Sequence, residues 1–317
     1  MMLHRIFMQA LLCVFVVCIV SNAQSFPAKA AEKVIIDTDI GDDIDDAFAV
    51  ALALRSPELQ ILGFSTTFGN TSLRAKLLDR LLGEVGREDI PIAVGSPTQT
   101  DSTLTQRRFA EGGRFARAFH PNAADFVLEQ IHRYPNEITL IALGPLVNVG
   151  ALIDKDSREF RELRRVVLMG GSIEQSYGDL GYFKPRGPEA EWNIRNDIPS
   201  ARKLFASGVP IFMMPLDSTQ LKLDEVKRQI VFQAGTPLTD ALTILYHQWG
   251  RETPTLFDPL TVAYAINPEL CPTKPMRIRV DDQGFTRVEA GAPNANVCLS
   301  SQSDAFFHFY IPRVAGQ

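Results

Sequence analysis

Short apolar runs rich in β-branched residues alternate along the chain with amphipathic stretches of helical length. The runs occupy residues 34–36, 62–67, 90–94, 138–143, 165–169 and 209–214. Strands that are apolar throughout are buried on both faces, so helices must cover both sides of the sheet. The pattern predicts an α/β fold with a Rossmann-like core: one three-layer domain whose open sheet is mostly parallel. From residue 219 onward we expect helices followed by a less regular tail.

Several of these runs end in polar or glycine-containing turns. The turns lie at residues 37–39, 66–70, 144–145, 170–171 and 216–217. In open parallel sheets, ligands bind in the crevice beyond the carboxyl ends of the strands. We therefore expect the functional site to be assembled from these turns.

The first residues differ from the rest of the chain. Residues 1–5 form a short basic segment, and an apolar run follows at residues 6–20. This is the pattern of a signal peptide, here residues 1–23 with cleavage as late as residue 30 as an alternative. It predicts a periplasmic or secreted protein whose catalytic domain spans residues 31–317, without stable membrane association after cleavage. An uncleaved anchor is the alternative, although the run is short for a membrane span.

Composition narrows the possible functions. The chain is 45% hydrophobic and 22% charged, which is typical of a globular protein with a sizeable core. A net charge of −5 argues against a surface that binds nucleic-acid phosphates. Cleavage of the leader leaves Cys271 and Cys298, which either form one disulfide or remain two buried thiols.

An acidic cluster follows the first apolar run. Residues 37–46 contain six aspartates: Asp37, Asp39, Asp42, Asp43, Asp45 and Asp46. Crowded carboxylates at the edge of a core have raised pKa values unless a cation or many donors share the space. A helix cap would explain one or two aspartates but not six. The cluster therefore predicts a site for a hard divalent cation.

Two other acidic motifs are alternatives to this interpretation. An EF-hand loop starting at Asp37 fails, because Asp42 stands where glycine is required and Phe48 where a glutamate is required. A phosphohydrolase of the haloacid-dehalogenase type also places Asp-x-Asp after its first strand, with Asp37 as the nucleophile. Gly41 departs from that motif, and the phosphohydrolase stays open only as an alternative.

Further motifs follow in order along most of the chain. They lie at residues 37–41, 45–47, 66–70, 143–148, 167–171, 190–193, 196–197 and 257–259. As an ordered set they resemble the nucleoside hydrolase family, whose members include inosine-uridine preferring enzymes. The resemblance implies a metal-dependent N-glycosyl hydrolase that cleaves ribonucleosides to ribose and free base. It also implies a homo-oligomer, either a dimer or a tetramer.

The resemblance assigns roles to individual residues. A calcium ion (Ca²⁺) would be held by Asp39, Asp46, Asp258 and the backbone carbonyl of Leu143, and Asp39 would also accept the proton of the attacking water. The residues expected to contact the nucleoside are Asp45, Asn70, Met169, Glu191, Asn193 and Phe257.

The sequence departs from the family pattern at three places. The first is residues 181–188, which contain no asparagine where the family commonly supplies another sugar contact. The acidic motif is two residues longer than the shorter family form, so Asp43 is an alternative to Asp45 or Asp46. Phe257 stands where inosine-uridine-type members often have histidine, and phenylalanine cannot protonate a departing base. We expect the ring to stack on the base, with a slight preference for purines. The base would leave as an anion or take its proton through water or another residue, and His247 and Tyr246 are the candidates for such a residue. An exported nucleoside-binding protein without turnover is the non-enzymatic alternative.

Overall fold

The computed structural model describes residues 30–178 and 186–317. The chain divides into Met1–Ala30 and Ala31–Gln317, and the elements of the fold belong to the second unit. The predicted signal peptide lies outside the described residues. No helix in the described part of the chain combines the length and the apolar character that crossing a membrane requires.

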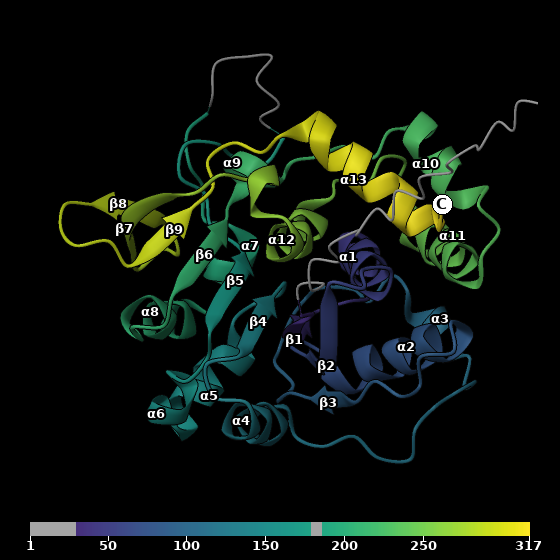
Figure 1. Cartoon of the computed structure of the whole chain (residues 1–317), viewed down its shortest axis with the longest axis horizontal. Helices are drawn as coiled ribbons and strands as arrows, with labels where there is room; N and C mark the ends of the chain where they lie inside the picture. The colour runs from purple at the N-terminus through teal and green to yellow at the C-terminus, as the bar shows by residue number, and fades with distance from the viewer. Residues whose placement is uncertain (1–29, 179–185) are drawn as a thin grey trace, which may run out of the picture. The chain divides into compact units, whose positions relative to one another are not determined.

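Nine strands form one sheet, in the order β3-β2-β1-β4-β5-β6-β9-β7-β8 (Figure 1). The strands are β1 Glu32–Thr38, β2 Leu59–Thr66, β3 Ile92–Val94, β4 Ile138–Ala142, β5 Arg165–Met169, β6 Ile211–Met214, β7 Lys274–Val280, β8 Thr286–Glu289 and β9 Ala295–Val297. Neighbours from β3 to β9 pair in parallel, and only β7 runs the other way. The prediction of an α/β fold with a mostly parallel sheet is confirmed.

Helices lie between the strands along the chain, and α13 follows the last strand. They are α1 Asp45–Leu54, α2 Thr71–Glu84, α3 Arg107–Ala110, α4 Ala123–Arg133, α5 Val147–Lys155, α6 Ser157–Phe160, α7 Trp192–Arg195, α8 Ile198–Ala206, α9 Leu216–Thr219, α10 Glu225–Phe232, α11 Pro237–Trp249, α12 Phe257–Ile266, the 3₁₀ turn η1 Pro268–Leu270 and α13 Ser303–Ala315.

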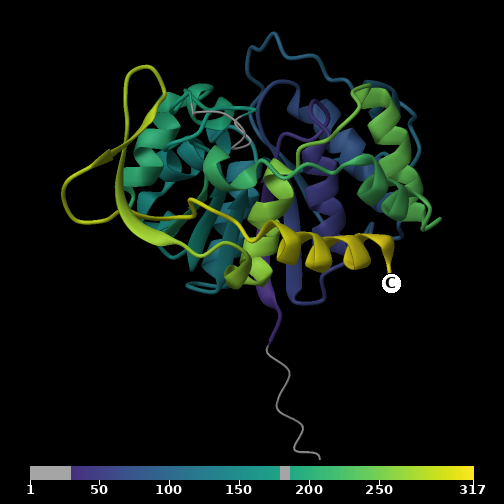
Figure 2. The same cartoon turned by 90° about the horizontal axis from the view of Figure 1, so that it is seen from above.

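Helices cover both faces of the sheet because strand residues alternate between two apolar cores. Val34 and Ile36 of β1 pack into a core with α1, α2, α11, α12 and α13. Ile35, between them, packs into a second core with α4, α5, α6 and α8. Figures 1 and 2 show these two helical layers on opposite sides of the sheet. The prediction of three layers is confirmed.

The region after residue 219 contains more strand than expected. β7, β8 and β9 add three strands to the edge of the sheet where a less regular tail was predicted. In β7 most side chains are exposed or half-buried, and only Ile278 and Val280 are buried. A half-exposed strand lacks the continuous apolar run that marked the first six strands. The two cysteines of this region form the disulfide Cys271–Cys298, which settles the alternative left open by the sequence.

Candidate active site

A pocket of about 700 Å³ lies beyond the carboxyl ends of the parallel strands. Asp39 follows β1, Leu143 follows β4, and Met169 is the last residue of β5. Nine of the ten predicted site residues line this pocket, namely Asp39, Asp45, Asp46, Leu143, Met169, Glu191, Asn193, Phe257 and Asp258. Asp39, Leu143 and Met169 come together because parallel strands end at the same edge of the sheet.

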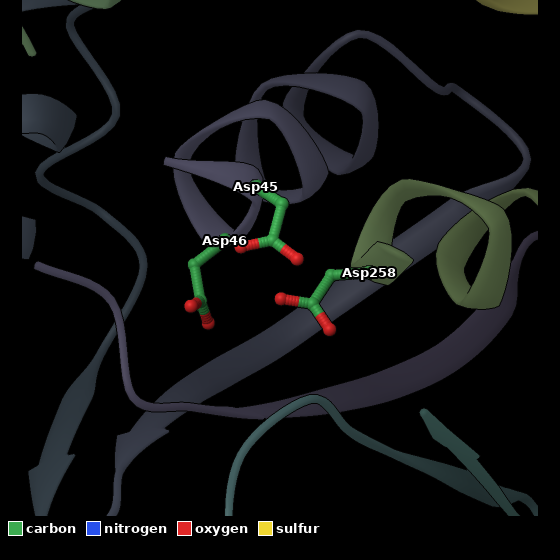
Figure 3. Close-up of side chains that lie close together, drawn as sticks. All are labelled: Asp45, Asp46 and Asp258. Atoms are coloured by element: carbon green, nitrogen blue, oxygen red, sulfur yellow. The ribbon is translucent and has the colours of Figure 1, made fainter. Parts of the chain in front are cut away.

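Three carboxylates converge within the pocket. Asp45 and Asp46 open α1, and Asp258 lies in the first turn of α12, a helix packed against α1. One oxygen of each side chain lies within 4.8 Å of the others, and all three residues are buried. Figure 3 shows the carboxylates gathered between the starts of the two helices. Helix amino termini favour negative charge, which partly offsets the repulsion between these groups.

Burial makes the ionised form of this cluster costly. It raises the pKa of Asp46 to about 7, despite a hydrogen bond from Thr38. Burial, and then the charges of neighbouring aspartates, raise the pKa values of Asp45 and Asp258 well above 3.8. Asp39 has a raised pKa for the same reasons, first burial and then the charge of Asp46. Three buried oxygen donors that repel one another fit a hard divalent cation.

A buried arginine holds the acidic loop in place. The guanidinium of Arg74 on α2 is fully buried and donates hydrogen bonds to the carbonyl oxygens of Phe68 at 2.8 Å and Ile40 at 3.0 Å. It also bonds to the carbonyl of Asp39 and pairs with the carboxylate of Asp42 at 3.0 Å. Sequence reasoning missed Arg74, because a single arginine in an amphipathic helix gives no signal that it is buried.

Side chains in the segment before α3 form hydrogen bonds to Asp42 and Asp43, in the lengthened part of the acidic motif. Thr105 Oγ1 donates to the carbonyl of Asp42 at 2.6 Å, and Gln106 Nε2 donates to the carbonyl of Asp43 at 2.8 Å. Ser102 Oγ bonds to the carboxylate of Asp42. The two additional residues of the motif are therefore anchored by hydrogen bonds from another part of the chain.

Glu191 and Asn193 form a second polar group in the pocket. Glu191 precedes α7 and accepts hydrogen bonds from the backbone N–H groups of Gly171 and Asn193, both at 2.9 Å. Tyr177 Oη donates to the same carboxylate at 3.2 Å. The side-chain amide of Asn193 donates to the carbonyl of Leu143 at 2.6 Å. A carbonyl has two lone pairs, so Leu143 keeps one for another partner.

Asn70 is the predicted site residue that does not line the pocket. It is exposed, and its side chain caps α2 by accepting a hydrogen bond from the N–H of Leu73 at 3.0 Å. Asparagine is among the preferred residues at this position of a helix. The structure therefore shows Asn70 as the cap of α2, and its contact with the nucleoside stays a prediction.

Asp37 is also absent from the lining of the pocket. Its carboxylate accepts hydrogen bonds from Ser65 Oγ at 2.5 Å and Asn148 Nδ2 at 2.7 Å, and the residue is buried. Burial raises its pKa to about 6, although these two hydrogen bonds lower it. The phosphohydrolase alternative needs Asp37 as an accessible nucleophile, and this arrangement contradicts it.

The two predicted proton donors on α11 lie elsewhere. Neither Tyr246 nor His247 lines the pocket, and Tyr246 Oη donates to the carbonyl of Glu252 at 2.8 Å. The polar and aromatic lining residues that sequence reasoning missed are Ser102, Thr103, Thr105, Tyr177, Trp192, Gln220, Lys222, Trp249, Arg251, Thr253 and Thr255. They come from separate segments without a shared motif.

Comparison with known proteins relates this chain to nucleoside hydrolases. Residues 34–308 match the sequence model of the inosine-uridine preferring nucleoside hydrolases. The chain is 31% identical to the pyrimidine-specific ribonucleoside hydrolase RihA of Citrobacter koseri, over 90% of this chain and 98% of that one. It superposes on a plant nucleoside hydrolase, PpNRh1, with a TM-score of 0.76 and 25% identity, over 90% and 99% of the chains. A purine-preferring ribonucleoside hydrolase from Gardnerella vaginalis gives a TM-score of 0.78 at 22% identity, over 90% and 98%.

Proposed function

The chain belongs to the inosine-uridine preferring nucleoside hydrolases, a family of N-glycosyl hydrolases, and on this premise we propose that it hydrolyses ribonucleosides to ribose and free base with the help of a bound divalent cation. The observation that carries the proposal is the convergence of three buried carboxylates, Asp45, Asp46 and Asp258, in the main pocket. Calcium is the ion implied by the family resemblance and by the all-oxygen donor set.

The cation would be held by Asp46 and Asp258, with Asp39 and the carbonyl of Leu143 as further ligands. Asp45 belongs to the same cluster and is the alternative to Asp39. When bound, the cation would neutralise the cluster and lower the pKa of an adjacent water. Asp39 lines the pocket, and in our proposal it accepts the proton of the water that attacks the sugar.

The sugar would lie between the acidic cluster and the group formed by Glu191 and Asn193. Glycosidic bond cleavage places positive charge on the ribose in the transition state, and nearby carboxylates stabilise that charge. The carboxylate of Glu191 is held by backbone N–H groups, and the amide of Asn193 is held by the carbonyl of Leu143. Groups fixed in this way select hydroxyls by position, because a misfit leaves buried polar atoms unpaired.

A slight preference for purines is our proposal for the base. Phe257 lines the pocket and packs edge to face against Tyr177, with ring centroids 5.8 Å apart. Trp249 adds another aromatic side chain to the lining. Aromatic walls favour the larger π-surface of a purine. Because relatives are named for pyrimidine as well as purine nucleosides, the test must include both.

We propose that the enzyme is exported and oligomeric. Residues before 34 lie outside the family match, and the disulfide Cys271–Cys298 suits an oxidising compartment. Amino-terminal sequencing of protein recovered from the periplasm would be expected to begin near residue 24 or 31. Light scattering after gel filtration tests the proposed dimer or tetramer.

The proposed activity is tested by measuring released ribose from inosine, adenosine, guanosine, uridine and cytidine, with calcium present and after chelation. We expect ribose with calcium, with the largest kcat/KM on a purine nucleoside, and none after chelation. The binding-protein alternative instead predicts calorimetric binding of nucleosides without ribose. If no nucleoside gives ribose in the presence of calcium, the proposed function is wrong.

A further inference from the structure

The departing base needs a proton, and Phe257 stands where inosine-uridine-type members often have a histidine that could give it. Phe257 has no transferable proton, and none of the described residues that line the pocket is a histidine. A base that leaves as an unprotonated anion leaves slowly unless a donor or a positive charge stabilises it. The donor must therefore be sought among the other lining side chains.

Apart from the carboxyl groups, three lining residues carry an N–H or O–H group that can ionise: Tyr177, Lys222 and Arg251. Tyr177 already donates to Glu191, and burial together with that negative charge raises its pKa further, so it is a poor acid. Arginine stays charged in proteins and does not transfer its proton. Lys222 remains.

Backbone pairing places Lys222 next to the start of α12. Lys222 and Thr255 form an antiparallel bridge, flanked by backbone hydrogen bonds from Leu223 N to Pro254 O at 2.9 Å and from Leu256 N to Leu221 O at 2.7 Å. Side chains of such a pair lie on the same side of the ribbon. Lys222 Nζ accordingly donates to Thr255 Oγ1 at 2.6 Å, two residues before Phe257. The ammonium is thus held by Thr255 in the lining of the pocket to which Phe257 also belongs.

The ammonium keeps donors for a ligand. It has three N–H bonds, and Thr255 takes one of them. Lys222 is half-buried, and burial lowers its pKa, while the charge of Asp43 acts in the opposite direction. Burial favours proton release, and the carboxylate of Asp43 favours the charged form that must be present before release.

We propose that Lys222 is the catalytic residue that protonates the departing base, an inference that rests on the proposed function. The bond from C1′ to the base nitrogen breaks, and its electron pair goes to the base, which takes one proton from the Lys222 ammonium. The oxygen of water bonds to C1′, and its proton goes to the carboxylate of Asp39. Asp39 then returns a proton to solvent and Lys222 takes one, so nucleoside and water give ribose and base.

The test compares two leaving groups in the Lys222→Met variant, which keeps the apolar stem but loses the ammonium. Inosine and uridine need a proton on the base, whereas the nitrophenolate of p-nitrophenyl β-D-ribofuranoside leaves as a stable anion. We expect kcat on the nucleosides to fall about 10²-fold to 10³-fold, the range of a general acid. On the nitrophenyl riboside we expect a change of less than about 3-fold.

Two further variants make the result specific. Lys222→Arg keeps the charge but cannot transfer a proton, and we expect it to lose nucleoside activity selectively as well. Lys203→Met removes a half-buried lysine that pairs with Asp154 and does not line the pocket, so turnover of both substrates should be unaffected. Circular dichroism and the melting temperature establish that each variant is folded.

The outcomes separate this inference from the proposed function. Equal losses on both substrates in folded Lys222→Met would mean a structural role, and unchanged nucleoside turnover would mean no role. Either result overturns the inference while leaving the hydrolase activity of the parent enzyme in place. A parent enzyme that releases ribose from no nucleoside overturns the proposed function itself.

Discussion

The two sides of the pocket are built in different ways. The acidic end consists of Asp39, Asp45, Asp46 and Asp258, of which three come from one motif after β1. The cationic wall consists of Lys222, Trp249, Arg251, Thr255 and Phe257, which come from the connections around α10, α11 and α12. The start of α12 belongs to both, because Phe257 and Asp258 are adjacent.

The two sides also differ in burial. The four aspartates of the acidic end are all buried. In the cationic wall Trp249 and Thr255 are buried, Lys222 and Phe257 are half-buried, and Arg251 is exposed. Buried like charges require a fixed frame and a counter-ion, and Arg74 supplies part of that frame. Partly exposed cations on connecting segments carry a smaller cost and tolerate change. In our proposal the acidic end holds the cation and the attacking water, and the cationic wall contacts the base and protonates it.

The largest expected effect is the loss of turnover in Asp39→Asn, which tests the role of the acidic end apart from that of the cationic wall. In Asp39→Asn the attacking water loses its base, so we expect kcat to fall about 10³-fold. Unlike Lys222→Met, this variant should lose activity equally on nucleosides and on the nitrophenyl riboside, because water attacks in both reactions. Steady-state kinetics with both substrates provides the measurement.

Asp37→Asn is the matched control, because Asp37 stands in the same motif but outside the pocket lining. Its activity should stay within about 5-fold of the parent enzyme. A fully active Asp39→Asn enzyme would contradict the assignment of the base.

An intermediate effect concerns the stability of the acidic end. Burial raises the pKa of Asp46 from 3.8 to about 7. The folded chain therefore keeps this proton up to a higher pH than the unfolded chain does. Without a cation this group therefore lowers stability as pH rises from 3.8 toward 7. Calcium at roughly 100 times its Kd would add about 2.7 kcal/mol, or about 5 °C in Tm.

Scanning calorimetry at two pH values measures this effect. We expect calcium to raise Tm at pH about 8 but much less at pH about 5, where protons compete for the carboxylates. Lys222→Met should respond as the parent enzyme does, whereas Asp258→Asn should lose the response. An equal shift at both pH values would argue against a cation bound by these carboxylates.

The smallest expected effect tests the boundary of the site. Asn70→Ala removes the cap of α2 and should lower the free energy of unfolding by about 1 kcal/mol, with KM unchanged. Asn122→Ala is the control, since Asn122 caps α4 in the same way. Chemical denaturation and kinetics of both variants provide the comparison. A rise in KM confined to Asn70→Ala would restore the predicted nucleoside contact.

Much of the site could be predicted because its residues follow strand ends. Strands that are continuously apolar identify the parallel core, and turns after β1, β4 and β5 must meet at one edge. Asp39 lies in the first of these turns, and Leu143 and Met169, which the family resemblance assigned, directly precede two others; all three line one pocket. Asn70 also follows a strand end, but it caps α2 and does not line the pocket. Position after a strand therefore predicts proximity to the site but not the direction of a side chain.

The sequence by itself determined the α/β core, the acidic cluster and the family, because each is encoded in local patterns or ordered motifs. Only the tertiary structure revealed the burial of Arg74, the addition of β7 to β9 to the sheet, and the bridge that sets Lys222 beside Thr255. These features depend on contacts between segments distant in sequence. Such contacts arise from packing and backbone pairing, which no short stretch of residues specifies alone.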